Sequence, residues 1–374
     1  MNARQLNKRL ASASSPDEKI SLLDALAEEL FDKENYAGAS GYYRQALRLE
    51  RQPNGRAYFA GQIGICHYNL GNDREALKHL EKSAQLFEPG KPEFMPDMCG
   101  FVNFHLGSIF EYQGKVAKSL EARRRCQQYI DSQEKDTQWM LYAGISRNYE
   151  ALGRPQDAIQ YYEKAIQVLS DNDPGLAYLY ESMADSHMKL KEYSEAISYY
   201  SKVLELAPDF ERRDEIYLKV ANCYDQITND RLALETYEKI LELKQITAKR
   251  ESLTWLYTKI AQCHFRLEQF EKSLLMTLEA LRRRPRSNLE RAEVRAFLTN
   301  NYYELGRYRE AVLEGEKTLK LAKQFQNSNL NLFYFRMALG YFKLGEKKSF
   351  ARFRALCKKL FPDDTWNGYL EKLA

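Results

Sequence analysis

Small side chains recur along the chain in similar surroundings, with a period of about 39 residues. We call these recurring positions the anchors. Consecutive anchors lie 37 to 43 residues apart, and the longest step contains a proline-rich stretch. The anchors are Ala39, Ala76, Ser119, Ala158, Ala196, Ala233, Ser273 and Ala311, with Phe350 in the ninth place.

Further columns keep a constant distance from the anchors. Small residues on facing helices allow two backbones to approach closely, and a ring on the neighbouring turn fills the remaining space. The pattern therefore predicts two closely packed antiparallel helices in each period. The small residues twelve positions before the anchors are Ala27, Gly64, Gly107, Ser146, Ala184, Ala221, Ala261, Thr299 and Ala338. Nine positions before the anchors stand Leu30, His67, Phe110, Tyr149, His187, Tyr224, His264, Tyr302 and Tyr341.

Glycine and proline indicate where the helices end. Five residues before the anchor, glycine fills five of the nine places, which suits a left-handed cap at the end of the first helix. Pro155 falls at the expected first turn of a second helix, where its missing N–H is harmless. Pro208, Pro285 and Pro362 all follow their anchors by twelve residues, where the second helix should stop. The glycines are Gly71, Gly114, Gly153, Gly306 and Gly345.

With these columns the chain resembles the tetratricopeptide-repeat family. The segments NYEALGRPQDAIQYYEKAI (148–166) and MKLKEYSEAISYYSKVLELAP (188–208) carry the resemblance most clearly. It implies an all-α fold, a right-handed superhelical solenoid of about nine antiparallel helical hairpins. The usual period of that family is 34 residues, so the present hairpins are about one helical turn longer. In this respect the chain is similar to longer-period solenoids such as kinesin light chains.

The expected organisation is one solenoid over 16–362 between two short terminal segments. Ser15-Pro16-Asp17-Glu18 is a capping box, so the first helix should begin near residue 16 after a partly frayed lead over 1–15. The stretch 88–97 holds three prolines and is either an extended connection or a loop that contacts a ligand. The basic amphipathic stretch 347–361 is a terminal cap or a patch for an anionic partner, and 363–374 completes the cap.

Composition and charge narrow the function classes. The formal charge of +4, from 56 basic and 52 acidic residues, gives no drive toward nucleic acid. No apolar stretch is long enough to span a membrane, and the N-terminus lacks the apolar core of a secretory signal. Six scattered cysteines without paired spacing favour reduced thiols and a cytoplasmic location.

The pairs Cys66-His67 and Cys263-His264 could suggest a metal or a nucleophile, but both fall in packing columns. Adjacent residues on a helix also point about 100° apart, which suits chelation poorly. The usual nucleotide-binding, metalloprotease and hydrolase motifs are absent from the sequence. We therefore expect no enzyme activity, no metal and no cofactor.

In the resembled family, the first helix of each hairpin lines a concave groove that holds a peptide. The corresponding positions are rich in rings, acidic near the middle, and include the amide series Asn222, Gln262 and Asn300. The carboxylate-clamp positions of chaperone-binding members hold Asp24, Glu28, Phe104 and Ser108 instead, so recognition of an acidic chain terminus is rejected. The groove candidates are Tyr68, Phe104, Glu111, Arg147, Glu150, Tyr178, Glu181, Asp185, Met188, Asn222, Asp225, Trp255, Gln262, Phe265, Asn300 and Tyr303.

The leading hypothesis is a scaffold or adaptor that binds a basic or amphipathic segment of another protein in this groove. One alternative is a regulatory solenoid that senses a short peptide and changes shape. Another is self-assembly through the terminal apolar residues Phe335, Leu339 and Phe342. The sequence leaves the oligomeric state and the identity of the partner open.

Overall fold

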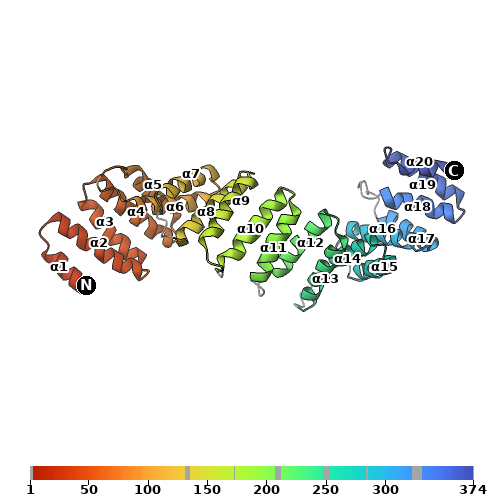
Figure 1. The fold of residues 1–374 in the computed structure, drawn as a ribbon, viewed down its shortest axis with the longest axis horizontal. Helices are drawn as coiled ribbons and strands as arrows, with labels where there is room; N and C mark the ends of the chain where they lie inside the picture. Colours follow the sequence, from red (N-terminus) through yellow and green to blue (C-terminus); the bar gives the residue numbers. More distant parts are fainter. Residues whose placement is uncertain are drawn as a thin grey trace. The chain divides into compact units, whose positions relative to one another are not determined.

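The computed structural model describes residues 3–91, 93–130, 135–171, 173–206, 212–246, 253–283, 285–321 and 331–373 (Figure 1). Every regular element in these ranges is an α-helix. None of the helices in this part of the chain is both long enough and apolar enough to cross a membrane. The helices are α1 (Ala3–Ser12), α2 (Pro16–Asp32), α3 (Tyr36–Leu49), α4 (Pro53–Asn69), α5 (Asp73–Leu86), α6 (Pro96–Tyr112), α7 (Val116–Tyr129), α8 (Lys135–Ala151), α9 (Pro155–Val168), α10 (Gly175–Lys189), α11 (Tyr193–Leu206), α12 (Arg213–Gln226), α13 (Asp230–Ile246), α14 (Thr254–Arg266), α15 (Phe270–Arg282), α16 (Asn288–Glu304), α17 (Tyr308–Leu321), α18 (Asn331–Lys343), α19 (Lys347–Leu360) and α20 (Trp366–Lys372).

The helices form two compact units, Met1–Ala207 and Pro208–Ala374. In the first unit, α2 packs on α3, α4 on α5, α6 on α7, α8 on α9 and α10 on α11. In the second unit the hairpins are α12–α13, α14–α15, α16–α17 and α18–α19. Nine hairpins therefore lie within the described residues, and the predicted all-α solenoid is confirmed.

The small-residue columns lie where the two helices of a hairpin meet. The anchors Ala39, Ala158 and Ala233 are 0% exposed, and so are Ala27, Ala184 and Ala261 twelve positions earlier. Because a larger side chain at these positions would separate the helices, the columns explain why the hairpins close tightly.

The turn inside each hairpin is left-handed at the same position, five residues before the anchor. Five glycines occupy it with φ between 69° and 73°. In the other four hairpins a residue with a side chain takes the same conformation: Glu34 (φ 58°), Lys191 (63°), Thr228 (56°) and Glu268 (59°). The backbone of the turn caps the first helix, as when the N–H of Arg154 donates to the carbonyl oxygen of Tyr149 at 2.9 Å. The glycine column thus marks a geometry that all nine hairpins share.

Several helix ends agree with their sequence signals. α2 begins at Pro16, and the Ser15 hydroxyl accepts a hydrogen bond from the N–H of Glu18 at 3.1 Å. Pro155 is the first residue of α9, and α19 ends two residues before Pro362. The expected N-terminal lead contains α1, whose Leu6 is 5% exposed and packs into a cluster with residues of α2.

The proline-rich stretch 88–97 lies against the first unit, and Pro92 is outside the described residues. The backbone N–H of Glu88 donates to Asn54 Oδ1 at 2.8 Å. The Phe94 ring contacts the rings of Phe87 and Tyr129 at centroid distances of 5.9 and 5.4 Å. The chain becomes helical again at Pro96, inside the stretch that the sequence predicts to be irregular.

Candidate functional site

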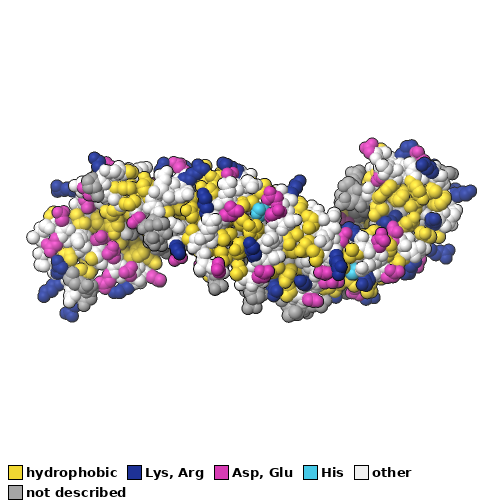
Figure 2. All heavy atoms as spheres, viewed as in Figure 1, with side chains coloured by type: hydrophobic (Ala, Val, Ile, Leu, Met, Phe, Trp, Pro, Cys, Tyr) yellow, Lys and Arg dark blue, Asp and Glu magenta, His cyan; other side chains and the backbone are white. Residues whose placement is uncertain are grey.

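The first helices of neighbouring hairpins pack on one another within each unit: α4 on α6, α6 on α8, and α16 on α18. We call the face that these first helices share the inner face of each unit. All sixteen candidate residues lie on first helices. In Figure 2, apolar side chains gather over the first unit between α2 and α6, with acidic side chains along their edge.

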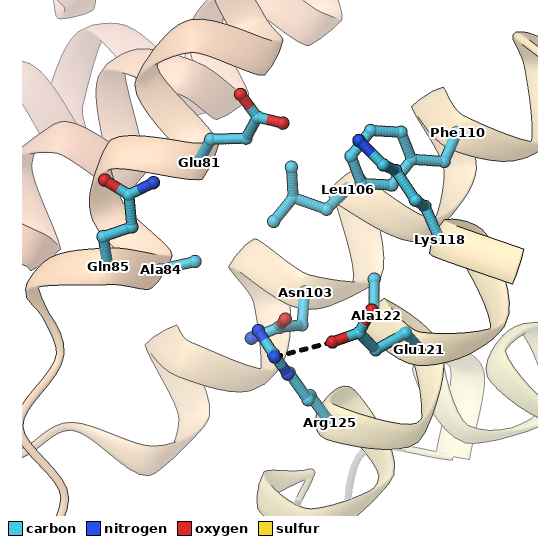
Figure 3. Close-up of a pocket in the computed structure, with 10 residues that line it drawn as sticks. All are labelled: Glu81, Ala84, Gln85, Asn103, Leu106, Phe110, Lys118, Glu121, Ala122 and Arg125. Carbon is cyan, nitrogen blue, oxygen red and sulfur yellow. Dashed lines mark hydrogen bonds and ion pairs between the residues drawn. The ribbon is translucent and has the colours of Figure 1, made fainter. Parts of the chain in front are cut away.

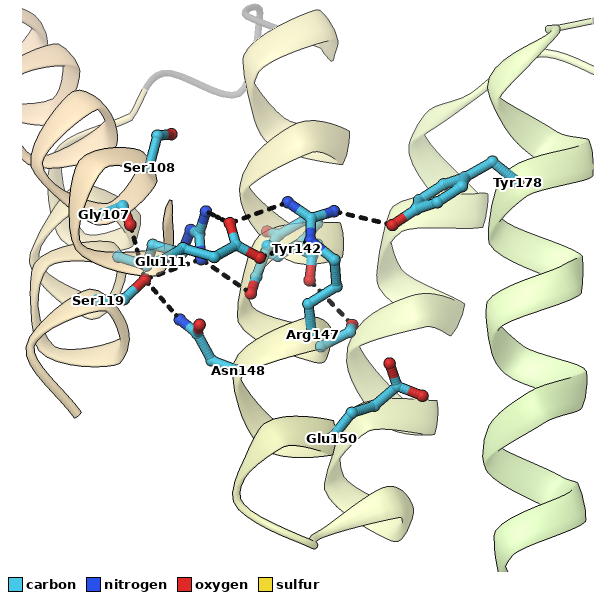
Figure 4. A network of polar contacts seen from close by, with 12 residues as sticks. Gly107, Ser108, Glu111, Ser119, Tyr142, Arg147, Asn148, Glu150 and Tyr178 are labelled. Carbon is cyan, nitrogen blue, oxygen red and sulfur yellow. Dashed lines mark hydrogen bonds and ion pairs between the residues drawn. The ribbon is translucent and has the colours of Figure 1, made fainter. Parts of the chain in front are cut away.

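A network of charged side chains crosses the inner face of the first unit (Figure 4). Glu111 on α6 accepts hydrogen bonds from Arg123 Nη2 at 2.6 Å and from Arg147 Nε at 2.7 Å. Arg147 also donates to the hydroxyl of Tyr178 on α10 at 3.1 Å. Burial alone would raise the pKa of Glu111, but the two guanidinium groups hold it below its ordinary value. The Glu111 carboxylate is therefore ionised, and the guanidinium groups of Arg123 and Arg147 balance its charge.

Arg123 replaces the ring found at the same place in other hairpins, four residues after the anchor, and is 2% exposed. Two glycines make room for it, since a Cβ at Gly107 would lie 2.7 Å from Arg123 Cγ and one at Gly144 would lie 2.4 Å from Arg123 Nε. Arg123 Nη1 donates to Ser119 Oγ at 2.9 Å and to the Gly144 carbonyl oxygen at 3.1 Å. The buried cation thus holds α6, α7 and α8 together.

The next carboxylate along the inner face is paired in the same manner. Glu150 accepts hydrogen bonds from Tyr162 at 3.1 Å and from Ser186 at 2.7 Å, and Lys189 Nζ lies 3.2 Å away. Asp185 accepts a short hydrogen bond from Tyr200. Each of these tyrosines stands four residues after its anchor and is 0% exposed.

The second unit repeats this arrangement at Asp225. Its carboxylate accepts hydrogen bonds from the Tyr237 hydroxyl at 2.8 Å, Lys259 at 3.2 Å and Arg266 at 2.7 Å. Tyr237 also donates to Asn222 at 3.3 Å. Burial, with Asp225 beside it, raises the pKa of Tyr237, so this hydroxyl stays a donor.

Most of the acidic groove candidates described above are thus paired with other side chains of the chain. Glu111, Glu150 and Asp225 each accept bonds from cations of the same or the next hairpin. These cations were not among the partners predicted from the sequence. Lys189 and Arg266 could have been found, because both stand seven residues before an anchor.

The remaining candidates differ in exposure. Tyr178 is 42% exposed and Trp255 36% exposed, whereas Glu181 is only 8% exposed. The rings of Tyr68 and Phe104 lie against His105, with centroids 4.9 and 5.6 Å from its ring. Met188 and Gln262 are half-buried.

Two buried polar side chains on the inner face of the second unit have unused hydrogen-bonding atoms. Asn300 on α16 is 7% exposed, and its Oδ1 accepts no hydrogen bond from any residue that the structure describes. Arg336 on α18 is 8% exposed and pairs with Glu304, but its Nη1 has no acceptor among the same residues.

Arg336 lies over two aromatic candidates. Its guanidinium carbon is 5.0 Å from the ring centroid of Phe265 on α14 and 5.8 Å from that of Tyr303 on α16. A side chain of α18 that reaches α14 must pass over α16, so Arg336 lies on the inner face. Arg336 was not predicted from the sequence as a candidate, although it is the one cation within the apolar segment NLFYFRMALGYF (331–342).

The described residues contain no cluster of three or more His, Cys, Asp or Glu side chains suited to a metal ion. Cys66 and Cys263 are both 0% exposed. His264 Nδ1 lies 2.9 Å from Gln269 Oε1. The Cys–His pairs therefore lie among packing contacts.

Two segments of the chain match models of the tetratricopeptide repeat, residues 141–168 in α8–α9 and residues 177–210, which begin in α10. Among solved structures, the C-terminal part of a TPR repeat-containing protein from Cytophaga hutchinsonii aligns with a TM-score of 0.51 at 21% identity. That alignment covers 71% of this chain and 96% of the other. The likeness supports the solenoid fold.

Two curated proteins are similar over parts of their length. Photosystem I assembly protein Ycf3 from Rippkaea orientalis is 35% identical over 83 residues, which is 22% of this chain and 43% of that protein. Protein CTR9 homolog from Arabidopsis thaliana is 22% identical over 258 residues, which is 62% of this chain and 23% of that protein. The chain thus spans less than half the length of either relative.

Proposed function

Because two segments of the chain match models of the tetratricopeptide repeat, we propose that it is a protein-binding scaffold whose inner faces hold a segment of another protein. In this proposal the chain carries out no catalysis and needs no cofactor. Its six cysteines are all unpaired and buried, which supports the expected cytoplasmic location.

The observation that carries the proposal is the pair of unused atoms on the inner face of the second unit. An unmet buried hydrogen-bonding group costs a fold about 1–3 kcal/mol. Asn300 Oδ1 is an unused acceptor and Arg336 Nη1 an unused donor. A peptide group offers a complementary N–H and C=O, so a main chain bound beside either residue would satisfy its unused atom.

The chemistry of the partner follows from the side chains of the inner faces that remain available for contacts. Since Glu111, Glu150 and Asp225 are already paired with cations, a basic segment gains less there than the sequence implies. Exposed rings such as Tyr178 and Trp255 remain available as apolar anchors. Of the two partner types considered, basic and amphipathic, we therefore propose the amphipathic one.

A display library of short random peptides, selected on the full chain, tests this function. We expect enrichment of peptides that alternate apolar or aromatic residues with polar ones. Asn300→Leu and Arg336→Gln should each weaken binding of the selected peptides by about tenfold. Leu313→Ser, at a 56% exposed position on the second helix α17, is the matched control and should leave binding unchanged.

Circular dichroism of each variant separates lost binding from lost folding. Enriched peptides that bind the Asn300→Leu chain as tightly as the parent would place recognition elsewhere and contradict the proposal. Selection of peptides marked only by lysine and arginine would instead support the basic partner.

A further inference from the structure

A hollow lies away from the inner face of the first unit, between α5, α6 and α7 (Figure 3). Its volume is about 280 Å³. Seven of the ten residues that line it belong to the second helices α5 and α7, and the α6 residues Asn103 and Phe110 point about 100° away from their neighbours Phe104 and Glu111 on the inner face. The hollow therefore opens between second helices and is separate from the inner face. We call it the outer cleft.

The floor of the outer cleft is apolar and its walls are polar. Leu106 and Ala122 are 4% and 6% exposed and form part of the floor. Glu81 and Gln85 of α5 stand on one side, and Figure 3 shows the Glu81 carboxylate directed toward the hollow. A site of this kind suits a side chain with an apolar stem and a polar end.

One buried polar atom at the cleft has no partner. Asn103 is 3% exposed, and its Nδ2 donates to the carbonyl oxygen of Cys99 at 2.8 Å. This bond fixes the orientation of the amide, because the opposite orientation would set Oδ1 against the Cys99 oxygen. Asn103 Oδ1 then accepts no hydrogen bond from the described part of the chain. Retaining such an atom costs stability, which a bound donor would recover.

The charged groups around the cleft indicate which charge a bound ligand should carry. Arg125 pairs with Glu121 at 2.7 Å, and Lys118 Nζ lies over the Phe110 ring at 5.6 Å. Glu81 makes no ion pair with any residue that the structure describes. The open groups are thus two acceptors, the Glu81 carboxylate and Asn103 Oδ1, which favour a cationic donor, and one cation, Lys118, whose ammonium lies over the Phe110 ring.

We propose that the outer cleft binds an arginine side chain presented by a protein partner. The stem of the arginine packs on Leu106 and Ala122, and its guanidinium donates to Asn103 Oδ1 and to Glu81. A guanidinium carries five donors in a planar fork and can reach two acceptors at once, which an ammonium does less well. The cleft is smaller than the pockets that hold drug-sized ligands, which matches a single side chain. This site is independent of the inner faces and adds a second contact surface to the scaffold.

N-acetyl-arginine N-methylamide is the probe, and its citrulline counterpart is a neutral control of the same shape. Both are titrated into the full chain with isotope-labelled alanine and leucine methyl groups, observed by NMR. We expect saturable shifts at Leu106, Ala84 and Ala122 at millimolar arginine probe, and binding of the citrulline probe weaker by about tenfold. Absence of saturation, or equal binding of the two probes, overturns the proposal.

Two variants locate the contact. Glu81→Gln and Asn103→Leu should each weaken arginine binding by about fivefold to tenfold. Glu163→Gln, which removes an exposed carboxylate of α9, should leave binding unchanged. Asn103→Leu should also fold with a thermal midpoint no lower than that of the parent, because it removes the unmet acceptor. If Asn103→Leu does not fold, Glu81→Gln alone decides, and unchanged binding in that variant contradicts the site.

Discussion

Four side chains occupy a backbone conformation that glycine adopts at lower cost. Glu34, Lys191, Thr228 and Glu268 have φ between 56° and 63°, at the place where five other hairpins carry glycine. For a residue with a Cβ, this conformation costs about 1–2 kcal/mol. Thr228 is the least suited of the four, since its β-branched side chain is crowded there.

Thr228→Gly should therefore stabilise the second unit by about 1 kcal/mol, as measured by chemical denaturation. The matched change in the opposite direction is Gly153→Ala, at φ 70° with no atom within 4 Å of the added Cβ. It should destabilise the first unit by about 1 kcal/mol through the backbone alone. A destabilised Thr228→Gly chain would show that the threonine side chain contributes more than its conformation costs.

Asp24 supplies a test that depends on pH. Burial, with Glu28 nearby, raises the pKa of Asp24 to about 6, although the Tyr58 hydroxyl donates to its carboxylate at 3.2 Å. A carboxyl whose pKa is raised by folding destabilises the fold when it is charged. The loss of folding free energy caused by Asp24 therefore grows as pH rises toward 6 and stays constant at higher pH.

Asp24→Asn should raise the thermal midpoint at pH 7.5 by about 2–4 °C, and the gain should shrink as pH falls through 6 toward 4. Scanning calorimetry of variant and parent at each pH measures the difference. Asp171→Asn, at an exposed loop position, is the control and should show no such trend. A gain that grows toward acid pH would refute the assigned cause.

At the scale of elements, the helical hairpins follow from the sequence because their packing depends on residue size. The anchor Ala158 and its partner column member Ser146 must be small where two helices cross, and that requirement is visible in one sequence. The pairing of charges, in contrast, cannot be read from one sequence. Glu111 and Arg147 lie on successive first helices, and no local sequence pattern predicts that Arg147 donates to Glu111. The predicted acidic character of the groove was incomplete for this reason.

The column of buried tyrosines predicts how the exceptional Arg123 can be replaced. Tyr162 and Tyr237 occupy the same place in their hairpins and donate to Glu150 and Asp225. A tyrosine at position 123 could make the same bond to Glu111, in the space that Gly107 and Gly144 leave.

Arg123→Tyr should thus change the free energy of unfolding by less than about 1.5 kcal/mol. Glu111→Gln should cost about 3 kcal/mol, since it leaves the buried Arg123 unpaired. Urea denaturation of both variants provides the comparison. The role assigned to Arg123 is contradicted if Arg123→Tyr destabilises the chain as much as Glu111→Gln.

At the scale of the whole molecule, the family and the fold can be predicted from the sequence, whereas the binding atoms cannot. Asn300 was a candidate because of its column, but that its Oδ1 is buried and unused is a property of the packed unit. Arg336 was not a candidate, because its role comes from reaching rings on two preceding first helices. The outer cleft lies between α5 and α7, and the recurring sequence columns do not predict the separation of these two helices.

The central claim is that the inner faces hold the amphipathic segment of the partner. Photo-crosslinking in the source cell tests it most directly, with a benzophenone amino acid at one position in each full-length chain. Tyr178 and Trp255 are exposed inner-face positions, and Leu275 and Leu313 are exposed positions on second helices at 54% and 56%. We predict that the two inner-face positions crosslink to a common partner and that the two outer positions do not. Crosslinks to that partner from Leu275 or Leu313 alone would contradict the account.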